Sequence, residues 1–267
     1  MASRSTPDGG ILETIKTVFW ALIIAGVFRT LLFQPFFIPS ESMKDTLLIG
    51  DFMFVNKMAY GYSRYSCPFA LCPIPGRIQL PLVSGDPQRG DVVVFRHPVS
   101  GQDYIKRLIG LPGDKIQMKL GILYINDVAA PQEPAGKFSE IFEPQGAEGS
   151  QPKCENYPVG LGGDCIRSRF VETLPNGVKH HVLNSENGPG DNTDVFTVPM
   201  GKYFFMGDNR DNSLDSRFSQ SPPINGVGFV PAENLIGRAD RVLFSAAGSS
   251  LFYVWTWRLD RFFKAIE

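Results

Sequence analysis

The hydrophobic and polar positions divide the chain into an apolar N-terminal run and a long region of short, alternating segments. The run from Ile15 to Phe37 contains about 23 residues, which as a helix rising about 1.5 Å per residue would span the ~30 Å hydrocarbon core of a bilayer. Arg29 lies inside the run, where its stem can stay in the apolar region while the guanidinium reaches the interface. The pattern predicts one membrane-spanning helix that ends near Gln34 and Pro35.

A cleavable secretory signal is the competing interpretation, because Val18 to Phe28 has the length of a signal h-region. No small-x-small cleavage pattern follows, and the chain continues through bulky residues 31–33, which favours an uncleaved anchor. Arg4 and Lys16 before the run weakly favour a cytoplasmic N-terminus.

After residue 37, short apolar runs alternate with turn residues, which is the pattern of strands. The predicted strands are FMFV at 52–55, DVVVF at 91–95, DYIKRLIGL at 103–111, ILYIND at 122–127 and KYFFMGD at 202–208. The segment 129–200 is rich in Gly, Pro and acidic residues, and we expect an insertion that bears one or two hairpins. The fold is therefore predicted to be mainly β.

The C-terminal tail carries apolar residues at near-helical spacing, with cations opposite them. The apolar positions are Leu251, Phe252, Trp255, Leu259, Phe262, Phe263 and Ile266, and the cations are Arg258, Arg261 and Lys264. Such an amphipathic helix suits a membrane interface, and it suits packing on the protein's own core almost equally well. Both alternatives stay open.

Composition and charge narrow the class of protein. Of the 267 residues, 43% are hydrophobic and 20% charged, which excludes a disordered or fibrous chain. The 27 Gly and 21 Pro residues are too many turn formers for a helical bundle. Because 26 basic residues face 27 acidic ones, there is no global positive field, and we expect no nucleic-acid partner.

The four cysteines indicate an oxidising compartment. Cys67 and Cys72 flank a Pro-rich loop, and Cys154 and Cys165 flank a Gly-rich one. Three pairings are allowed, and the two local ones close short loops at the least entropic cost. A zinc site is disfavoured because neither C-x₂-C pairs nor a suitably spaced His accompany the cysteines, while free cytosolic thiols remain an alternative.

Two serines follow the predicted span almost at once. In an extended segment, Ser40 and Ser42 share one face, which presents two hydroxyls near the membrane surface. Paired serines beside a proline usually form no more than a turn. Their significance depends on a partner elsewhere in the chain.

Lys106 is the strongest candidate for that partner. Period-two alternation places it between Tyr104 and Leu108, on a face that is half buried. Burial disfavours the charged amine, and lowering its pKa by about two raises the neutral fraction at pH 7 from about 1 in 2,500 to several per cent. A neutral lysine can act as general base toward a serine hydroxyl, whereas a lysine reaching solvent from a strand edge is the alternative. Lys44 is a local rival, but its position between Met43 and Asp45 suggests exposure.

The segment GDNRDNSLDSR at 207–217 is a dense polar loop after an apolar strand. It can be held together by carboxylate–guanidinium pairs and by side-chain hydrogen bonds to the backbone. A calcium loop is disfavoured, because Arg210 takes the third ligand position and Ser213 the place of the obligatory glycine. The chain has no G-x-S-x-G, H-E-x-x-H or G-x-x-x-x-G-K motif, and a Ser-His-Asp triad with His97, His180 or His181 has no support in the pattern.

In their order, these segments resemble bacterial type I signal peptidases. After the N-terminal span, the matching blocks are IPSESM, TLLIGDFMFVNKMAYG, RGDVVVFRHP at 89–98, DYIKRLIGLPGDK at 103–115, GDNRDNSLDSR at 207–217 and VPAENLIGRA at 230–239. They cover about a third of the chain but frame nearly all of it.

The resemblance implies roles for the residues at matching positions. Ser42 would be the nucleophile, Lys106 the general base, and Ser40 an oxyanion donor beside the Ser42 backbone N–H, while Ser213 would orient the Lys106 amine. Supporting ion pairs would come from Asp208, Arg210, Asp215 and Arg217. Pockets for small side chains one and three residues before the cut would be lined by Phe36, Ile38, Pro39, Met43, Leu47, Tyr104 and Ile105.

The resemblance also implies an organisation of the chain. The expected parts are a cytoplasmic N-terminus and anchor (1–37), a signal-peptidase-like β-rich catalytic core (38–128 and 201–245), an inserted β-hairpin subdomain (129–200) and an aromatic amphipathic tail (246–267). The substrates would be signal peptides of exported pre-proteins. A monomer in the bacterial cytoplasmic membrane, with its catalytic domain on the periplasmic side and no metal or cofactor, would cleave them and contact membrane lipid.

Two residues depart from the family's commonest pattern. Glu41 stands where glycine is frequent, and in a strand it would point away from Ser40 and Ser42 and be tolerated. Asp45 stands where proline is frequent, and we expect it to loosen the turn and to raise the pKa of Lys106 if it came close.

Two rival functions remain. A self-processing serine–lysine protease is disfavoured by the membrane span and by the lack of a DNA-binding segment. A non-catalytic anchored module that binds exported chains by strand addition would need no lysine facing a serine.

Overall fold

The computed structural model describes residues 10–67, 73–81, 83–145, 149, 151–185, 187–248 and 252–266. Within these ranges one α-helix, α1 (Ile11–Leu31), precedes a mainly β body, as predicted. The strands are β1 (Phe33–Phe37), β2 (Asp51–Asn56), β3 (Tyr62–Ser63), β4 (Arg77–Ile78), β5 (Val92–Arg96), β6 (Asp103–Gly110), β7 (Lys115–Lys119), β8 (Ile122–Ile125), β9 (Val128–Ala129), β10 (Gln132–Ile141), β11 (Asp164–Thr173), β12 (Lys179–Leu183), β13 (Phe196–Thr197), β14 (Lys202–Met206), β15 (Val230–Pro231) and β16 (Leu235–Ser245). The 3₁₀ turns are η1 (Arg64–Ser66), η3 (Arg210–Asn212), η4 (Ala232–Asn234), η5 (Val254–Thr256) and η6 (Leu259–Arg261).

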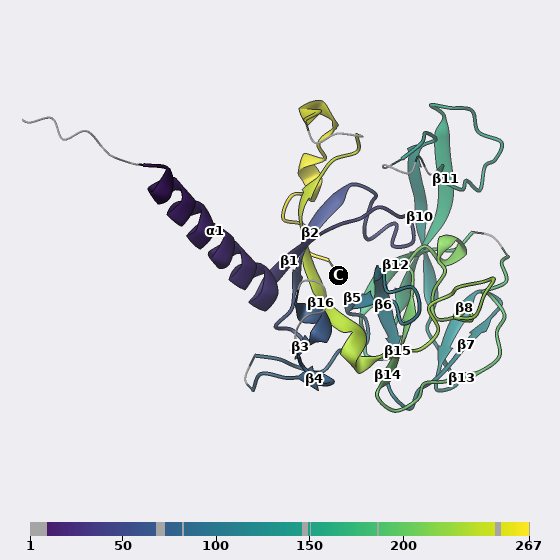
Figure 1. Ribbon diagram of the computed structural model, residues 1–267. Coiled ribbons are helices and arrows are strands. Elements are labelled where there is room, and N and C mark those ends of the chain that lie inside the picture. Colours follow the sequence, from purple (N-terminus) through teal and green to yellow (C-terminus); the bar gives the residue numbers. More distant parts are fainter. Residues whose placement is uncertain are drawn as a thin grey trace, which may run out of the picture.

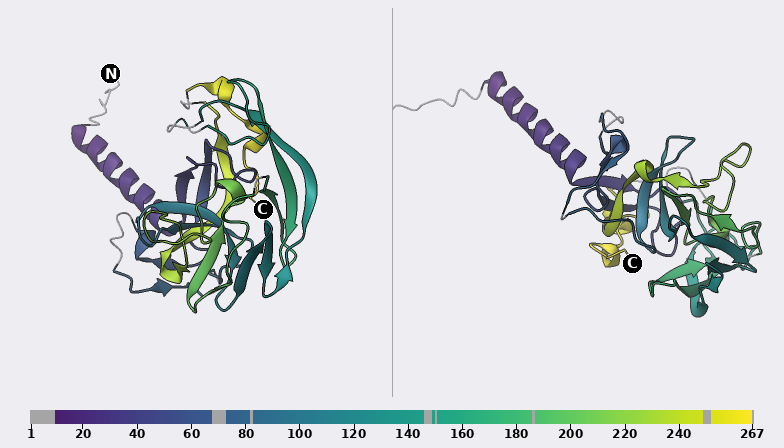
Figure 2. Two further views of the ribbon diagram at one scale, coloured as in Figure 1. Left: turned by 90° about the vertical axis from the view of Figure 1, so that its right-hand side faces the viewer. Right: turned by 90° about the horizontal axis from the view of Figure 1, so that it is seen from below.

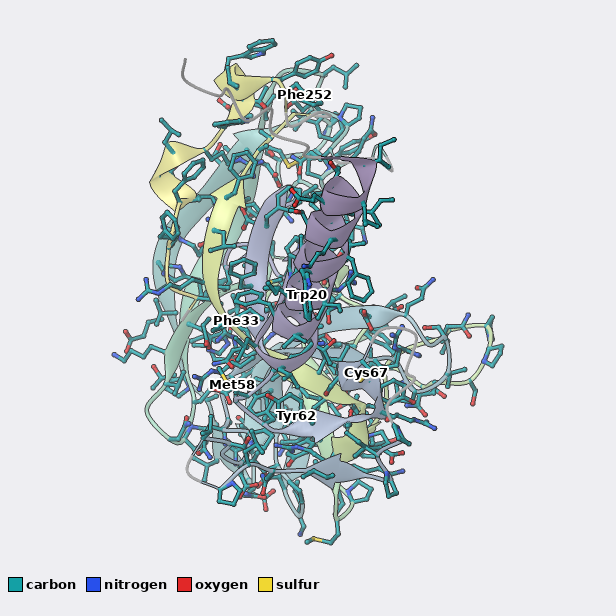
Figure 3. All side chains as sticks on the ribbon, turned by 60° about the vertical axis from the view of Figure 1, so that its left-hand side comes forward. Trp20, Phe33, Met58, Tyr62, Cys67 and Phe252 are labelled. Atoms are coloured by element: carbon teal, nitrogen blue, oxygen red, sulfur yellow. A yellow bond between two sulfur atoms is a disulfide. The ribbon has the colours of Figure 1, made fainter. Side chains whose placement is uncertain are left out.

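The helix α1 projects from the β-rich body and buries none of its residues (Figure 1). Its length and hydropathy are sufficient to cross a membrane. The helix ends at Leu31, before the predicted end near Gln34 and Pro35, because Phe33–Phe37 form strand β1 and pair with β2 from Phe33 opposite Asn56 to Phe37 opposite Phe52. Pro35 explains the change, since it disfavours helical backbone at the preceding residue and is tolerated in an edge strand. Figure 3 labels Trp20 on α1 and Phe33, where the chain enters the sheet.

The central sheet has seven strands in the order β1-β2-β16-β5-β6-β14-β15, and neighbouring strands pair antiparallel. Both faces of β5 are covered, because Val93 and Phe95 belong to one buried cluster while Val92 and Val94 belong to others. This explains the unbroken apolar run of that strand. The strand β16 bends at register shifts, as bulged strands do.

A second group of strands comes mainly from the segment 129–200. The strands β10, β11 and β12 form an antiparallel sheet whose long strands curve along one side of the body (Figure 2). A disulfide joins Cys154 to Cys165 beneath Phe142. Cys67 is also disulfide-bonded, while Cys72 lies outside the described residues. Strand β13, near the end of the segment 129–200, pairs with β7. It thereby joins the sheet β13-β7-β8-β9, in which β7 and β8 precede residue 129.

The C-terminal tail is not the predicted amphipathic helix; its described residues, 252–266, form the turns η5 and η6. Bridges pair Trp257 with Ala246 and Ala265 with Arg241, so this part of the tail runs back along β16. Leu251, which the helical pattern included, lies outside the described residues. The helix fails because buried Arg261 turns inward onto the fully buried carboxylate of Asp51, at 2.9 and 2.5 Å.

We predict that Arg261→Met lowers the free energy of unfolding by about 3 kcal/mol, because it leaves the carboxylate of Asp51 buried without its bidentate partner. Urea unfolding of the full chain in detergent measures this. The control is Arg241→Met, whose exposed guanidinium makes a hydrogen bond to the Phe263 carbonyl and should matter by less than about 0.5 kcal/mol. Equal losses in the two variants would contradict the buried pair's role.

Candidate active site

Ser42 lies in a turn rather than in the extended strand predicted for residues 40–42. Within the turn, Lys44 N–H donates to the Glu41 carbonyl at 3.0 Å and Leu47 N–H to the Met43 carbonyl at 2.8 Å. The chain turns because Met43 and Leu47 bury their side chains in the core below. The two hydroxyls nevertheless stay together, with 3.4 Å between Ser40 Oγ and Ser42 Oγ.

Strand β6 carries Lys106 to this turn. Its Nζ lies 2.5 Å from Ser42 Oγ and 3.1 Å from the Ile105 carbonyl oxygen, and 5% of the residue is exposed. Burial lowers the pKa of Lys106 to about 8, while Asp215 and Asp208 act in the opposite direction. About a tenth of such amines are neutral at pH 7. Residues 64 apart in sequence thus form a buried amine–hydroxyl pair.

The loop 207–217 packs directly against the Ser42 turn. A Cβ on Gly207 would lie 2.3 Å from Ser213 Oγ and 2.5 Å from the Ser42 carbonyl oxygen, so only glycine allows this approach. Asn209 N–H donates to that carbonyl, and Asn209 Nδ2 donates to the carbonyl of Glu41, each at 3.1 Å. The loop therefore holds the backbone on both sides of the Ser42 nitrogen.

Ion pairs support this loop, but only one of them lies within it. Asp215 receives Arg217 Nε and Nη2 at 2.9 Å each, and although burial alone would raise the pKa of Asp215, Arg217 holds it below its usual value. Asp208 and Arg210, expected as further supports, find partners on other strands: Arg107 and Glu172.

Arg107 is fully buried on β6, and its Nε and Nη2 donate to the carboxylate of Asp208 at 2.8 and 2.7 Å. Thr46 Oγ1 donates to the same carboxylate at 2.5 Å. Arg210 Nη1 and Nη2 likewise donate to the carboxylate of Glu172 on β11, at 2.9 and 2.6 Å. Although burial opposes it, Arg210 and His180 hold the pKa of Glu172 well below its usual range. The position of Arg107 inside the apolar strand 103–111 could have indicated its role as a buried ion-pair partner. No sequence pattern marks Glu172 for such a role.

Ser213 lies beside the pair without joining it. Its Oγ is buried and has no hydrogen-bond partner among the described atoms, so the contact to the Lys106 amine implied by the family resemblance is not made in this structure. The neighbouring side chain of Asn212 instead donates to Glu41 Oε2 at 2.8 Å.

Lys44 and Glu41 differ most from expectation. Lys44 is 1% exposed rather than exposed, and its Nζ contacts Glu41, Glu140 and Gln145. Glu41 is buried as well, since the turn directs its side chain into the protein. Asp45 pairs with Arg169 at 3.3 Å and His181 at 3.1 Å, and it is not among the groups that shift the pKa of Lys106.

A groove of about 990 Å³ opens beside Ser42 and Lys106. Of the predicted pocket residues, the groove is lined by Phe36, Ile38, Pro39, Tyr104 and Ile105. Met43 and Leu47 are instead buried in the core, while Met53 and Val94, which the sequence did not suggest, do line it. Because β14 pairs with β6 only from Arg107 to Gly110, the start of β6 has a free edge facing the groove among the described strands.

No group of three or more His, Cys, Asp or Glu side chains is placed to hold a metal ion within the described part of the chain. A serine hydroxyl bonded to a buried amine, beside a groove of peptide size, is the arrangement of a serine endopeptidase.

Comparison with known proteins gives the family. A model of the family described as "Signal peptidase, peptidase S26" matches residues 11–244. The signal peptidase I of Rickettsia typhi is 40% identical over 248 residues, covering 87% of this chain and 81% of that protein. The signal peptidase I of Rickettsia canadensis is 42% identical over 241 residues, covering 86% and 78%. A crystal structure of a signal peptidase I from Enterococcus faecalis is 30% identical and covers 58% of this chain and 97% of that one, with a TM-score of 0.29.

The chain therefore belongs to the signal peptidase family, peptidase S26, which confirms the resemblance noted in the sequence. It is a serine endopeptidase that removes signal peptides, and its apolar N-terminal helix is consistent with the membrane anchor of a bacterial signal peptidase. The non-catalytic binding module is not supported.

Proposed function

We propose that Ser42 and Lys106 are the catalytic pair of this peptidase. The observation that carries the proposal is the 2.5 Å hydrogen bond between Lys106 Nζ and Ser42 Oγ, made by an amine whose burial lowers its pKa to about 8. Such an amine is neutral often enough near neutral pH to accept the hydroxyl proton.

The reaction proceeds in two halves. Ser42 Oγ attacks the carbonyl carbon of the scissile bond as Lys106 Nζ takes its proton, and the Ser42 backbone N–H and the Ser40 hydroxyl stabilise the resulting oxyanion. The C–N bond then breaks, and the Lys106 proton passes to the leaving amine of the mature chain. A water molecule, deprotonated by Lys106, attacks the carbonyl carbon of the acyl ester. The bond from that carbon to Ser42 Oγ breaks, Lys106 returns the proton to Ser42 Oγ, and the signal peptide leaves with a C-terminal carboxylate.

The signal peptide lies extended along the groove. Its backbone pairs with the free edges of β1 and of the start of β6, as in recognition by strand addition. The substrate residues before the cut are then surrounded by Phe36, Ile38, Pro39, Tyr104 and Ile105. Because these side chains are bulky, only small substrate side chains fit between them. The loop 207–217 lies against the catalytic pair and is held by the ion pairs of Asp208, Arg210, Asp215 and Arg217. Ser213 orients the Lys106 amine once bound substrate brings the Ser213 hydroxyl within hydrogen-bonding distance of that amine.

The enzyme acts as a monomer at the outer face of the cytoplasmic membrane, with its N-terminus in the cytoplasm. The disulfide between Cys154 and Cys165 supports the outer side, because disulfides persist in oxidising compartments. Membrane lipid contacts the aromatic tail patch, which we define as Phe252, Tyr253, Val254, Trp255, Leu259 and Phe263; these residues are 44 to 89% exposed. Figure 3 shows Phe252 at the end of the body away from Tyr62.

We predict that Ser42→Ala and Lys106→Ala each lower kcat for a pre-protein in detergent by at least about 1,000-fold, because each removes one member of the pair. Lys106→Arg should be as inactive, since a guanidinium keeps the charge but does not release its proton. The exposed Lys115→Ala serves as control and should keep parental kcat. Circular dichroism checks the fold, and substantial turnover by either alanine variant would refute the pairing.

The pH dependence of cleavage follows from the lowered pKa of Lys106. Below about pH 8 the amine is protonated and is no base, so kcat/KM should fall about tenfold for each pH unit from 7 to 6 and level off above about 8. Initial rates between pH 5.5 and 9.5 measure this. A profile that stays flat through pH 7 would contradict an amine as general base.

Lipid contact by the tail is tested by point substitution, because a deletion would also remove the Arg261 anchor. Phe252→Ser with Trp255→Ser should slow cleavage of a pre-protein in liposomes several-fold and leave cleavage of a short peptide in detergent unchanged. Val128→Ser with Met200→Ser removes two other exposed apolar residues, which are 59% and 83% exposed, and should change neither rate. Equal rates in liposomes for both double variants would argue against lipid contact.

A further inference from the structure

Four charged side chains are buried together beside Ser42. Glu41 and Lys44 come from the Ser42 turn, Glu140 from β10 and Arg167 from β11; we call them the buried quartet. Their side chains are 4%, 1%, 12% and 5% exposed, respectively. Two negative and two positive charges thus balance one another where water is largely excluded.

The quartet is continuous through its contacts. Lys44 Nζ lies 3.1 Å from Glu41 Oε1 and 2.7 Å from Glu140 Oε2, and Gln145 Oε1 accepts from the same amine at 2.8 Å. Arg167 Nη2 donates to Glu140 Oε1, and Arg167 Nη1 lies 3.9 Å from Glu41 Oε2. The network therefore fastens the turn that carries Ser42 to the long hairpin β10–β11.

Stability alone does not account for such a cluster. Burying charges carries a desolvation penalty that their mutual attraction barely offsets, and apolar side chains of the same volume stabilise a core at least as well. What ion pairs add is direction, because each bond requires its two partners in one relative position. The bonds of the buried quartet thus restrict where the Ser42 turn can lie relative to β10 and β11.

The turn is also held from its other side. Glu41 Oε2 accepts from Asn212 at 2.8 Å, and Asn209 bonds the carbonyls of Glu41 and Ser42. Lys106 itself contacts neither support, since it arrives on β6 of the central sheet, where the neighbouring Arg107 bonds Asp208 of the loop and Thr46 of the turn. The distance between Ser42 Oγ and Lys106 Nζ therefore depends on how the hairpin and the loop 207–217 place the turn against that sheet.

We propose that the buried quartet positions Ser42 for attack, with Lys44 as the central positioning residue that ties the turn to the hairpin. This inference rests on the proposed role of Ser42 as nucleophile. It also explains why glutamate stands at position 41: its carboxylate joins the quartet to the loop 207–217. Because displacements of about 1 Å at a reacting group can cost about 100-fold in rate, loosening the turn should act on turnover rather than on substrate binding.

The test compares three variants of the full chain in detergent. Lys44→Met keeps the aliphatic stem but leaves Glu41 and Glu140 with Arg167 as the one remaining cation of the quartet. We expect kcat to fall at least tenfold with KM within threefold, and the melting temperature to drop. Glu41→Gln with Lys44→Met restores charge balance, so the melting temperature should largely recover while kcat does not. Lys44→Arg keeps a cation at position 44, so its kcat should stay within threefold of that of the parent.

The controls separate this inference from the proposed catalytic pair. Lys202→Met removes an exposed lysine and should change neither kcat nor melting temperature. Ser42→Ala is assayed in parallel: turnover by that variant would overturn the catalytic pair itself. With Ser42→Ala inactive, a parental kcat in Lys44→Met, or a kcat that recovers together with the melting temperature in the double variant, would overturn the positioning role. If Lys44→Met does not fold, the charge-balanced double variant decides alone, since parental kcat there refutes the proposal and a tenfold loss supports it.

Discussion

The contact between a buried amine and a serine hydroxyl is the constraint on which the rest of the structure depends. In the proposed mechanism Lys106 has to be largely removed from water, because a solvated lysine is almost entirely protonated near neutral pH. It also has to end within hydrogen-bonding distance of Ser42, which it does at 2.5 Å. Strand β6 meets both requirements at once, since its covered faces remove the solvent while its pairing with β5 sets the direction of the side chain.

Around this pair the protein keeps its other buried charges in compensated sets. Asp208 is held by Arg107, Asp215 by Arg217 and Glu172 by Arg210. Unpaired, such carboxylates would favour the protonated form of the neighbouring lysine; paired with arginine, they leave desolvation as the dominant influence on its pKa. Two of these pairs, Asp208–Arg107 and Arg210–Glu172, also tie the loop 207–217 to the distant strands β6 and β11, so electrostatic compensation and rigid support of the site have a common structural origin.

The position of the site also suits its substrates. The chain passes from α1 into β1 and reaches Ser42 within about a dozen residues, so the active-site groove lies close to the end of the apolar helix. A signal peptide likewise places its cleavage site just beyond an apolar segment. In the proposed membrane-anchored enzyme, a shared membrane would replace a search in three dimensions by a local encounter. The free edges of β1 and β6 present backbone hydrogen-bonding groups to an extended chain of almost any sequence, so small pockets are left to provide selectivity.

Local patterns of residues were sufficient to predict several features of the protein. The apolar N-terminal helix and the mainly β body follow from the spacing of hydrophobic residues, and the ordered motifs were enough to identify the family. The apolar neighbours of Lys106 indicated its burial, although the structure buries both faces of β6 from Lys106 to Gly110 and not one face alone. The sequence did not reveal the turn at residues 42–46, the burial of Lys44 and Glu41 or the partners of Asp208 and Arg210, because these depend on contacts with residues up to 171 positions away. Pro35 and Arg261 make the same point, since an edge strand and a buried carboxylate overrode their helical context. Periodicity records which face of an element is apolar, but only the packed structure decides which charged groups are enclosed together.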